Sequence, residues 1–202
     1  MRQLNISRIA SYKPTSAAEG NRQAAVLAPI IERSDGDYLL FTKRADHLGQ
    51  HPGQMSFPGG GREAVDSSLT DTAKREAHEE IGLKPPEVDI VGRLDDIPTI
   101  SGYSVRPFVG TAPDRSYTPD ENEVAEIAIL SVQDLTNLNN YHSECRVHPH
   151  QANVRIHYFE VDGFTVWGAT GRMLAQLLEI TTDWEIPPEA DKIIDAESEF
   201  QR

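Results

Sequence analysis

The chain has 202 residues, of which 38% are hydrophobic, and its formal net charge is -13 at pH 7. This length favours a single domain, and the negative charge argues against nonspecific binding to nucleic acid or to anionic membranes. A ligand that carries phosphate groups therefore needs local help from a cation, from a few basic side chains, or from both. The surplus of acidic residues fits either a solvated surface or adaptation to high salt.

Cys145 is the only cysteine, so an internal disulfide is excluded and nothing in the sequence requires an oxidising compartment. The opening stretch MRQLNISRIASYKP lacks the apolar core and cleavage site of a secretion signal. No other stretch approaches the length of a membrane span. We therefore expect a cytoplasmic protein.

Residues 1–22 are polar with scattered apolar positions, which predicts an arm or a short helix lying on the domain. Two apolar runs follow, QAAVLAPII and DYLLFTKR, and the pair Asp35-Gly36 between them is a strong hairpin signal. Further strands are predicted in three short segments rich in β-branched or apolar residues, over 88–97, 103–112 and 123–130.

The clearest helix pattern follows a loop rich in glycine and proline at 49–62. The stretch TDTAKREAHEEIGL consists of strong helix formers, with a start at Thr70 or Asp71 and a stop at Gly82.

The last third of the chain predicts a helix, a hairpin and a second helix. The stretch SVQDLTNL fits a short helix capped by Ser131, and Asp162-Gly163 marks a hairpin between VRIHYFEV and FTVWG. In GATGRMLAQLLEI, apolar residues at helical spacing predict a helix that closes the core, namely Met173, Leu174, Leu177 and Leu178.

These elements predict a mixed α/β fold, with a sheet that carries helices on both faces. We expect an arm at 1–22, one domain at 23–184, and a mobile acidic tail at 185–202.

Three carboxylates, Glu76, Glu79 and Glu80, fall within one turn of the predicted helix. Like charges at this spacing repel, and the residues four positions after Glu76 and Glu79 are Glu80 and Leu83, so no lysine relieves the repulsion. A hard divalent cation such as Mg²⁺ or Mn²⁺ would turn the repulsion into shared attraction. The plainer alternative is an acidic, solvated helix face.

The glycines of PGGG, just before this helix, favour the cation over the plain acidic face. They leave backbone groups unshielded by side chains and free to approach a metal or a phosphate.

This stretch resembles the Nudix box, whose pattern is G-x5-E-x7-R-E-U-x-E-E-x-G-U with U a bulky apolar residue. The segment REAHEEIGL, from Arg75 to Leu83, matches the second half of the pattern. Ala77 stands where the family takes a bulky apolar residue.

The first half of the box departs from the pattern and leaves two registers open. With Gly60 as the box glycine, the acidic position falls on Asp66, and eight residues instead of seven separate it from Arg75. With Gly61 the spacing is regular, but the acidic position falls on Ser67. We prefer Gly60, because it retains a carboxylate and keeps FPGG in its usual place.

The resemblance implies an α/β/α sandwich around a mixed sheet, with a loop-helix-loop metal site that hydrolyses a nucleoside diphosphate linked to another group. Carried over position by position, Glu76 and Glu80 would ligate Mg²⁺ or Mn²⁺, and Glu79 would be a further ligand or a partner through water. The carbonyl of Gly59 would be a backbone ligand, and Arg75 would hold the carboxylates in place.

The general base is assigned with two alternatives. Glu76 is our first choice, and Glu123, just before a predicted strand, is the second. Glu121, Glu123 and Glu126 also fit simple exposed acids.

Upstream of the box, LFTKRADHLGQHPGQMSFPGG resembles the coenzyme A pyrophosphatase branch of this family, as does VWGATGRMLAQLLEI downstream, so the likeness spans roughly 24–181. Positions in register are Thr42, Arg44, Gly53 and Phe57 to Gly60. The branch's Leu, Ser and second Arg are replaced by Phe41, Ala45 and Gly49. The resemblance implies substrate contacts from Arg44, Gly53, Phe57 and Gly60.

The missing arginine matters because a guanidinium is a natural clamp for a terminal phosphate such as the 3'-phosphate of coenzyme A. Lys43, Arg62 and Arg106 are the candidates to replace it.

In that branch, coenzyme A and water would give 3',5'-ADP and 4'-phosphopantetheine. ADP-ribose or NADH is the alternative substrate, and a domain that binds a nucleotide without cleaving it is the alternative of another class. The expected partner is thus a small nucleotide diphosphate, with no nucleic acid and no membrane. The sequence does not decide between a monomer and a homodimer.

Two further groups of residues have both a structural and a functional interpretation. A zinc site is conceivable in HSECRVHPHQANVRIHY, with ligands from His142, Cys145, His148, His150 and His157, but we favour a polar loop near the substrate. Tyr158 and Trp167 fit adenine stacking or core packing, and we favour the core.

Overall fold

The structure is a computed structural model of the chain, and it describes residues 3–17, 22–49, 51–99, 102–147 and 153–195. The helices in this part are α1 (Ile6–Ser11), α2 (Leu69–Ile81), α3 (Val132–Leu135) and α4 (Gly168–Thr181), with 3₁₀ turns at Pro85–Glu87 and Leu138–Asn140. None of the helices in these ranges has the length and apolar character needed to cross a membrane.

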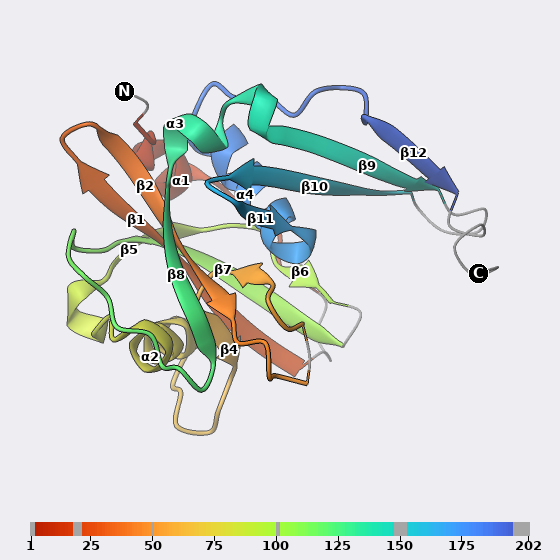
Figure 1. Ribbon diagram of the computed structural model, residues 1–202. Coiled ribbons are helices and arrows are strands. Elements are labelled where there is room, and N and C mark those ends of the chain that lie inside the picture. The colour runs from red at the N-terminus through yellow and green to blue at the C-terminus, as the bar shows by residue number, and fades with distance from the viewer. Residues whose placement is uncertain (1–2, 18–21, 50, 100–101, 148–152, 196–202) are drawn as a thin grey trace.

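Two sheets form the framework of the fold (Figure 1). The larger sheet contains β1 (Arg22–Arg33), β2 (Gly36–Arg44), β3 (Met55–Ser56), β4 (Gly59–Gly61), β5 (Asp89–Arg93), β6 (Ile97–Pro98), β7 (Tyr103–Thr111) and β8 (Val124–Ser131). The smaller sheet contains β9 (Tyr141–Val147), β10 (Val154–Val161), β11 (Phe164–Trp167) and β12 (Lys192–Asp195). Since β1 pairs parallel with β7 and antiparallel with β2, the larger sheet is mixed, as predicted.

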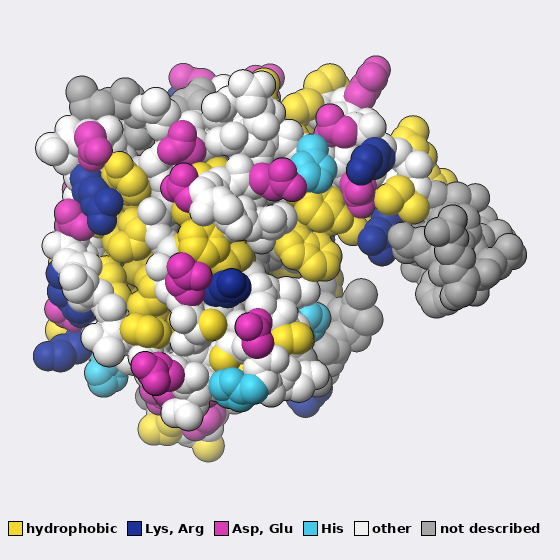
Figure 2. All heavy atoms as spheres, viewed as in Figure 1, with side chains coloured by type: hydrophobic (Ala, Val, Ile, Leu, Met, Phe, Trp, Pro, Cys, Tyr) yellow, Lys and Arg dark blue, Asp and Glu magenta, His cyan; other side chains and the backbone are white. Residues whose placement is uncertain are grey.

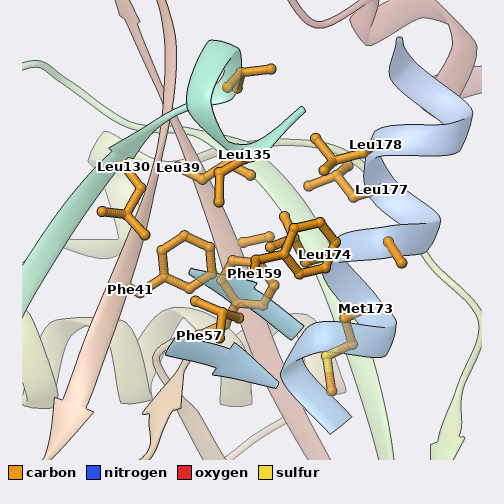
Figure 3. Packing of buried hydrophobic residues seen from close by; sticks show 14 of the residues in the cluster. Leu39, Phe41, Phe57, Leu130, Leu135, Phe159, Met173, Leu174, Leu177 and Leu178 are labelled. Carbon is orange, nitrogen blue, oxygen red and sulfur yellow. The ribbon is translucent and has the colours of Figure 1, made fainter. Parts of the chain in front are cut away.

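Helices α2 and α4 cover opposite faces of the larger sheet (Figure 1). Side chains alternate between the faces of a strand, and Leu40 packs in the apolar cluster that contains α2, whereas Leu39 and Phe41 pack in the cluster that contains α4. Figure 3 shows the contribution of α4 to its cluster, from Met173, Leu174, Leu177 and Leu178. The predicted α/β/α sandwich is therefore confirmed.

The ends of α2 are set by a capping box and a left-handed glycine. Ser68 accepts a hydrogen bond from the Asp71 amide, and the Asp71 carboxylate accepts one from the Ser68 amide. Gly82 ends the helix at φ 67°, as predicted. The helix begins at Leu69, so the predicted start at Thr70 or Asp71 is slightly late, because Ser68 is the cap.

Both predicted hairpins are confirmed. Ser34 and Asp35 form the turn between β1 and β2, one residue earlier than the predicted pair Asp35-Gly36, because Gly36 already pairs with Arg33. Asp162-Gly163 connects β10 to β11. Asp162 and Gly163 both have positive φ, at 53° and 81°, as a two-residue type I′ turn requires. Ser131 caps the short helix α3 with its side chain, also as predicted.

The smaller sheet contains strands that the sequence pattern did not reveal. β9 pairs antiparallel with β10 on one side and parallel with β12 on the other. The prediction of a mobile tail over 185–202 is therefore wrong for Lys192–Asp195, which are held in the sheet by backbone pairing with β9.

The N-terminal segment is tied to α4. The amide of Asn5 donates to the carbonyl of Thr181 at 2.7 Å, and Leu4 and Ile9 are buried in the cluster that contains α4. The short helix α1 is consequently part of the core layer on that side of the sheet.

Candidate active site

Two of the three predicted carboxylates on α2 face inward. The side chain of Glu80 is buried and that of Glu76 is 13% exposed, whereas that of Glu79 is 56% exposed. Gly60 on β4 lies directly against Glu76, since a Cβ at position 60 would stand 2.5 Å from Glu76 Oε1. The side chain of Glu76 can approach β4 this closely only because position 60 is a glycine.

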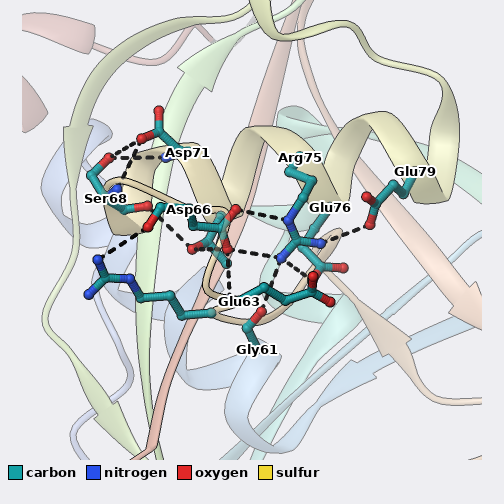
Figure 4. A network of polar contacts seen from close by, with 10 residues as sticks. Gly61, Glu63, Asp66, Ser68, Asp71, Arg75, Glu76 and Glu79 are labelled. Carbon is teal, nitrogen blue, oxygen red and sulfur yellow. Dashed lines mark hydrogen bonds and ion pairs between the residues drawn. The ribbon is translucent and has the colours of Figure 1, made fainter.

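Arg75 is the centre of an ionic network that joins α2 to the preceding loop (Figure 4). Its Nε donates to Asp66 Oδ1 at 2.9 Å, and its Nη2 donates to Asp66 Oδ2 at 3.1 Å. Nη2 also lies 3.0 Å from Glu76 Oε1 and donates to the Gly61 carbonyl at 3.1 Å. Nη1 donates to Glu79 Oε2 at 2.8 Å. The guanidinium thus sets the positions of Glu76 and Glu79 together.

Asp66 is the anchor of this network. Besides Arg75, its carboxylate accepts hydrogen bonds from the Glu63 amide and from Thr72 Oγ1, both at 2.9 Å. The bond from Arg75 is the largest of the effects that hold the pKa of Asp66 well below its usual range. In the register that begins at Gly60, Asp66 occupies the acidic position. Its carboxylate therefore orients Arg75 and does not serve with Glu80 as a metal ligand.

Glu80 has the features expected of a ligand for a hard cation. Burial raises its pKa to about 8, a backbone hydrogen bond from Gly59 opposes this rise, and the charges of Glu76 and Glu123 add to it. Its Oε2 is buried and has no hydrogen-bond partner among the described residues. An ionised carboxylate in this position would leave Oε2 without a hydrogen-bond donor among the described residues, and a bound divalent cation would supply the missing contact.

The described residues contain no group of three His, Cys, Asp or Glu side chains that could by itself enclose a metal. Mg²⁺ usually takes one or two carboxylates from the protein and fills its remaining positions with waters and substrate phosphates. Glu76 and Glu80 match that pattern, while Glu79 turns toward Arg75.

Arg44 and Glu123 approach the site from the ends of β2 and β8. The charge of Arg44 lowers the pKa of Glu80, and Arg44 Nε is buried without a hydrogen-bond partner in the described structure. Glu123 is exposed, and its carbonyl accepts from the Ala45 amide at 2.9 Å. The Asp120 amide donates to the Glu80 carbonyl at 2.9 Å, which ties the loop before Glu123 to the end of α2.

Phe57 and Gly53 lie in different environments, although both were predicted to contact substrate. Phe57 is 2% exposed and stacks on Phe41 with a centroid distance of 4.7 Å (Figure 3). It is a core residue, and the prediction that it contacts substrate is wrong because its ring is covered on the α4 side of the sheet. Gly53 lines an open cleft.

This cleft has a volume of about 640 Å³ and lies between the loop before β3, the strands β2 and β8, and the hairpin of β10 and β11. Lys43, Glu126 and Trp167 line it together with Gly53. The sequence analysis interpreted Glu126 only as a simple exposed acid, and no local pattern places it in a cleft, since the cleft forms where two sheets meet. Figure 2 shows apolar and charged side chains interspersed on the face that carries β2, β8 and β11.

The histidine-containing segment is strand at both ends. The prediction of a polar loop is therefore wrong for His142 to Val147, whereas the part from Val154 onward forms the hairpin strand that the sequence predicted. His142 stacks on Tyr158, and His157 is buried against Tyr141 with 2.9 Å between Tyr141 Oη and His157 Nδ1. His148 and His150 lie outside the described residues.

A family model described as the NUDIX domain matches residues 21–151. An Enterobacter sp. protein named "Uncharacterized Nudix hydrolase NudL" is 37% identical over 180 residues, covering 85% of this chain and 90% of that protein. A Yersinia pestis protein of the same name is 38% identical over 160 residues, covering 79% of each. The crystal structure of a Nudix hydrolase from M. smegmatis, RenU, aligns with a TM-score of 0.46 and 21% identity over 58% of this chain and 75% of that one.

Proposed function

The chain belongs to the Nudix hydrolase family, and from that premise we propose that it is a metal-dependent pyrophosphohydrolase that cleaves coenzyme A to 3',5'-ADP and 4'-phosphopantetheine. Nudix hydrolases act on small nucleotide-containing substrates and generally use divalent metal ions. The observation that carries the proposal is the buried, unpartnered Oε2 of Glu80 beside Glu76 and the glycines of β4.

In this proposal Glu76 and Glu80 hold the cation together with the Gly59 carbonyl, and Glu79, which pairs with Arg75, is a further ligand or a partner through water. A bound Mg²⁺ or Mn²⁺ would neutralise phosphate oxygens and lower the pKa of an attacking water. Arg75 keeps the carboxylates oriented, and its own position depends on Asp66. Such preorganised charge is the main contribution a protein makes to phosphoryl transfer.

The proton of the attacking water would be accepted by Glu76 or by Glu123. Glu76 is the first proposal, because it is partly buried beside Glu80 and burial raises its pKa above that of a solvated carboxylate. Glu123 is the second, because its exposed side chain lies close enough to raise the pKa of both inward-facing carboxylates.

The environments of the three candidate phosphate clamps favour Lys43. Arg106 donates two hydrogen bonds to the buried carboxylate of Asp96, at 2.9 and 2.8 Å. Arg62 donates to the carbonyls of the loop before α2. Lys43 lines the cleft and lies 4.0 Å from the Glu126 carboxylate, a long pairing that a phosphate would readily displace.

The test is chromatographic product analysis after incubation with coenzyme A, ADP-ribose or NADH, each with Mg²⁺, Mn²⁺ or a chelator. We expect metal-dependent release of 3',5'-ADP from coenzyme A, lost in Glu80→Gln and retained in the matched surface control Asp71→Asn. Cleavage of ADP-ribose or NADH alone would contradict the proposed substrate. Binding without cleavage of any of them would contradict the proposed reaction.

A further inference from the structure

Three aromatic rings form a parallel row across the smaller sheet, with Trp167 at the end that borders the cleft. His142, Tyr158 and Trp167 are directly opposite one another on β9, β10 and β11. The rings of His142 and Tyr158 are 4.7 Å apart with an interplanar angle of 5°, and those of Tyr158 and Trp167 are 5.9 Å apart at 6°. Tyr158 Oη donates to Glu144 Oε2 at 3.1 Å, which fixes the middle ring.

We infer that Trp167 is the stacking platform for the adenine base of the substrate and that Lys43, which also lines the cleft, contacts a phosphate of the same nucleotide. This inference rests on the proposed function, which requires a substrate with an adenine nucleotide. Trp167 is 37% exposed and lines the cleft, while Tyr158 covers one face of its ring. A base entering the cleft would extend the row by one more ring.

The cleft and the carboxylates of α2 flank the same end of β2. Lys43 lines the cleft, whereas the next residue, Arg44, acts electrostatically on Glu80 on the other face of the sheet. The chain from Gly53 to Gln54 closes this strand end, since the Gly53 amide donates to the Arg44 carbonyl at 3.1 Å and the Arg44 amide donates to the Gln54 carbonyl at 3.0 Å. In the proposed pose the base stacks on Trp167, and the rest of the substrate passes this strand end toward the carboxylates of α2.

The size and character of the cleft fit a nucleotide. Its volume of about 640 Å³ falls in the range of roughly 300–1,000 Å³ that small-molecule sites occupy. It combines an aromatic wall from Trp167 with a basic side chain from Lys43, the two features that a base and a phosphate require.

The second tryptophan supplies an internal control. Trp184 is 3% exposed and packs edge-on against Tyr141, so it is a core residue. A ligand that reaches the cleft should therefore quench the fluorescence of Trp167 and leave that of Trp184 unchanged.

The experiment is a fluorescence titration of the protein with 3',5'-ADP and 4'-phosphopantetheine as separate probes, neither of which contains the diphosphate bond that the proposed reaction cleaves. We expect saturable quenching by 3',5'-ADP, no quenching by 4'-phosphopantetheine, loss of the quenching in Trp167→Phe and its retention in Trp184→Phe. Quenching by 3',5'-ADP that persists in Trp167→Phe, or no quenching at all, would overturn the inference.

Kinetics in the otherwise native protein provide the second readout. Trp167→Leu should raise KM for an adenine-containing substrate about tenfold, with a smaller effect on kcat, and Trp167→Phe should restore most of the loss because a ring is kept. Equal KM values in Trp167→Leu and the native protein would overturn the inference even if coenzyme A is cleaved. Quenching through Trp167 without cleavage of any substrate would instead contradict the proposed function alone.

Discussion

Helices α2 and α4 cover opposite faces of the same sheet, but they pack in different ways. Helix α4 fills its side with large apolar residues such as Leu174 and Leu177. Helix α2 packs with the small residues Ala73 and Ala77, both fully buried, and also buries the carboxylate of Glu80. Small contact residues let α2 lie close to the sheet, and this brings its carboxylates against the glycines of β4. One helix therefore maximises packing, while the other accepts buried charge in order to build a site.

The first way to test this contrast is to remove the buried charge on α2. We predict that Glu80→Gln lowers kcat/KM by about 10³-fold, or ~4 kcal/mol, because the cation loses a ligand and with it the stabilisation of charge in the transition state. The melting temperature should not fall, since glutamine has the same shape and needs no counter-charge. Steady-state kinetics and thermal denaturation of the same preparation give both values. A variant with lower stability and unchanged kcat/KM would reverse the roles assigned to the two helices.

The second test disturbs the packing helix instead. Leu177 is fully buried on α4, and we predict that Leu177→Ala lowers the free energy of unfolding by about 3 kcal/mol through lost burial and a residual cavity. Activity per folded molecule should be nearly unchanged. Urea denaturation measures the loss, and Leu138→Ala, at an exposed position, is the control with an expected change below about 0.5 kcal/mol.

The third test concerns the ionic network around Arg75 on α2. We predict that Asp66→Asn lowers kcat/KM by about 10- to 100-fold, because Arg75 loses the anchor that orients it toward Glu76 and Glu79. Asp71→Asn removes a carboxylate from the same helix end without touching Arg75, and its kcat/KM should stay at the native value. If both variants behaved alike, the network would have no role in orienting the carboxylates.

The smallest predicted effect is on the pH dependence of stability, and it comes from His157, which is buried on the α4 side. Burial lowers its pKa to about 4, with the charges of Arg155 and Arg172 adding to this. The imidazole of His157 therefore binds a proton more readily in the unfolded chain than in the folded one. Its contribution to stability is complete above pH 6.5 and is lost as the pH falls toward 4. We predict that native protein loses about 2 kcal/mol more stability between pH 7 and pH 5 than His157→Gln does.

Denaturation curves at the two pH values measure this difference, and His78→Gln, at an exposed position on α2, should retain the native loss. An identical loss in all three proteins would show that His157 is not the group responsible.

The parts of the molecule that sequence analysis predicted depend on local patterns. The capped helix ending at Gly82 and the hairpins signalled by Asp35-Gly36 and Asp162-Gly163 are encoded within a few residues, and the structure contains all of them, with the first turn one residue earlier, at Ser34 and Asp35. The helical spacing of Glu76 and Glu80 likewise places both on one side of α2, because their geometry follows from 3.6 residues per turn.

The parts that were missed depend on contacts between distant residues. β12 pairs with β9, nearly fifty residues earlier, and no local pattern indicates an edge strand of only four residues. Phe57 was assigned to the substrate because its motif lies beside the site, but whether an aromatic ring faces a cleft or the core depends on its partner, here Phe41. The cleft itself exists only where the two sheets meet.

If the inward carboxylates of α2 hold a divalent cation, as proposed, then Mn²⁺ binding should depend on both of them. Electron paramagnetic resonance of free Mn²⁺ can be followed during titration with the native protein, with Glu76→Gln, with Glu80→Gln and with the Asp71→Asn control. We expect the native protein and the control to remove the free-ion signal at the same concentration, and both site variants to need at least about tenfold more protein. Equal binding by all four proteins would contradict it.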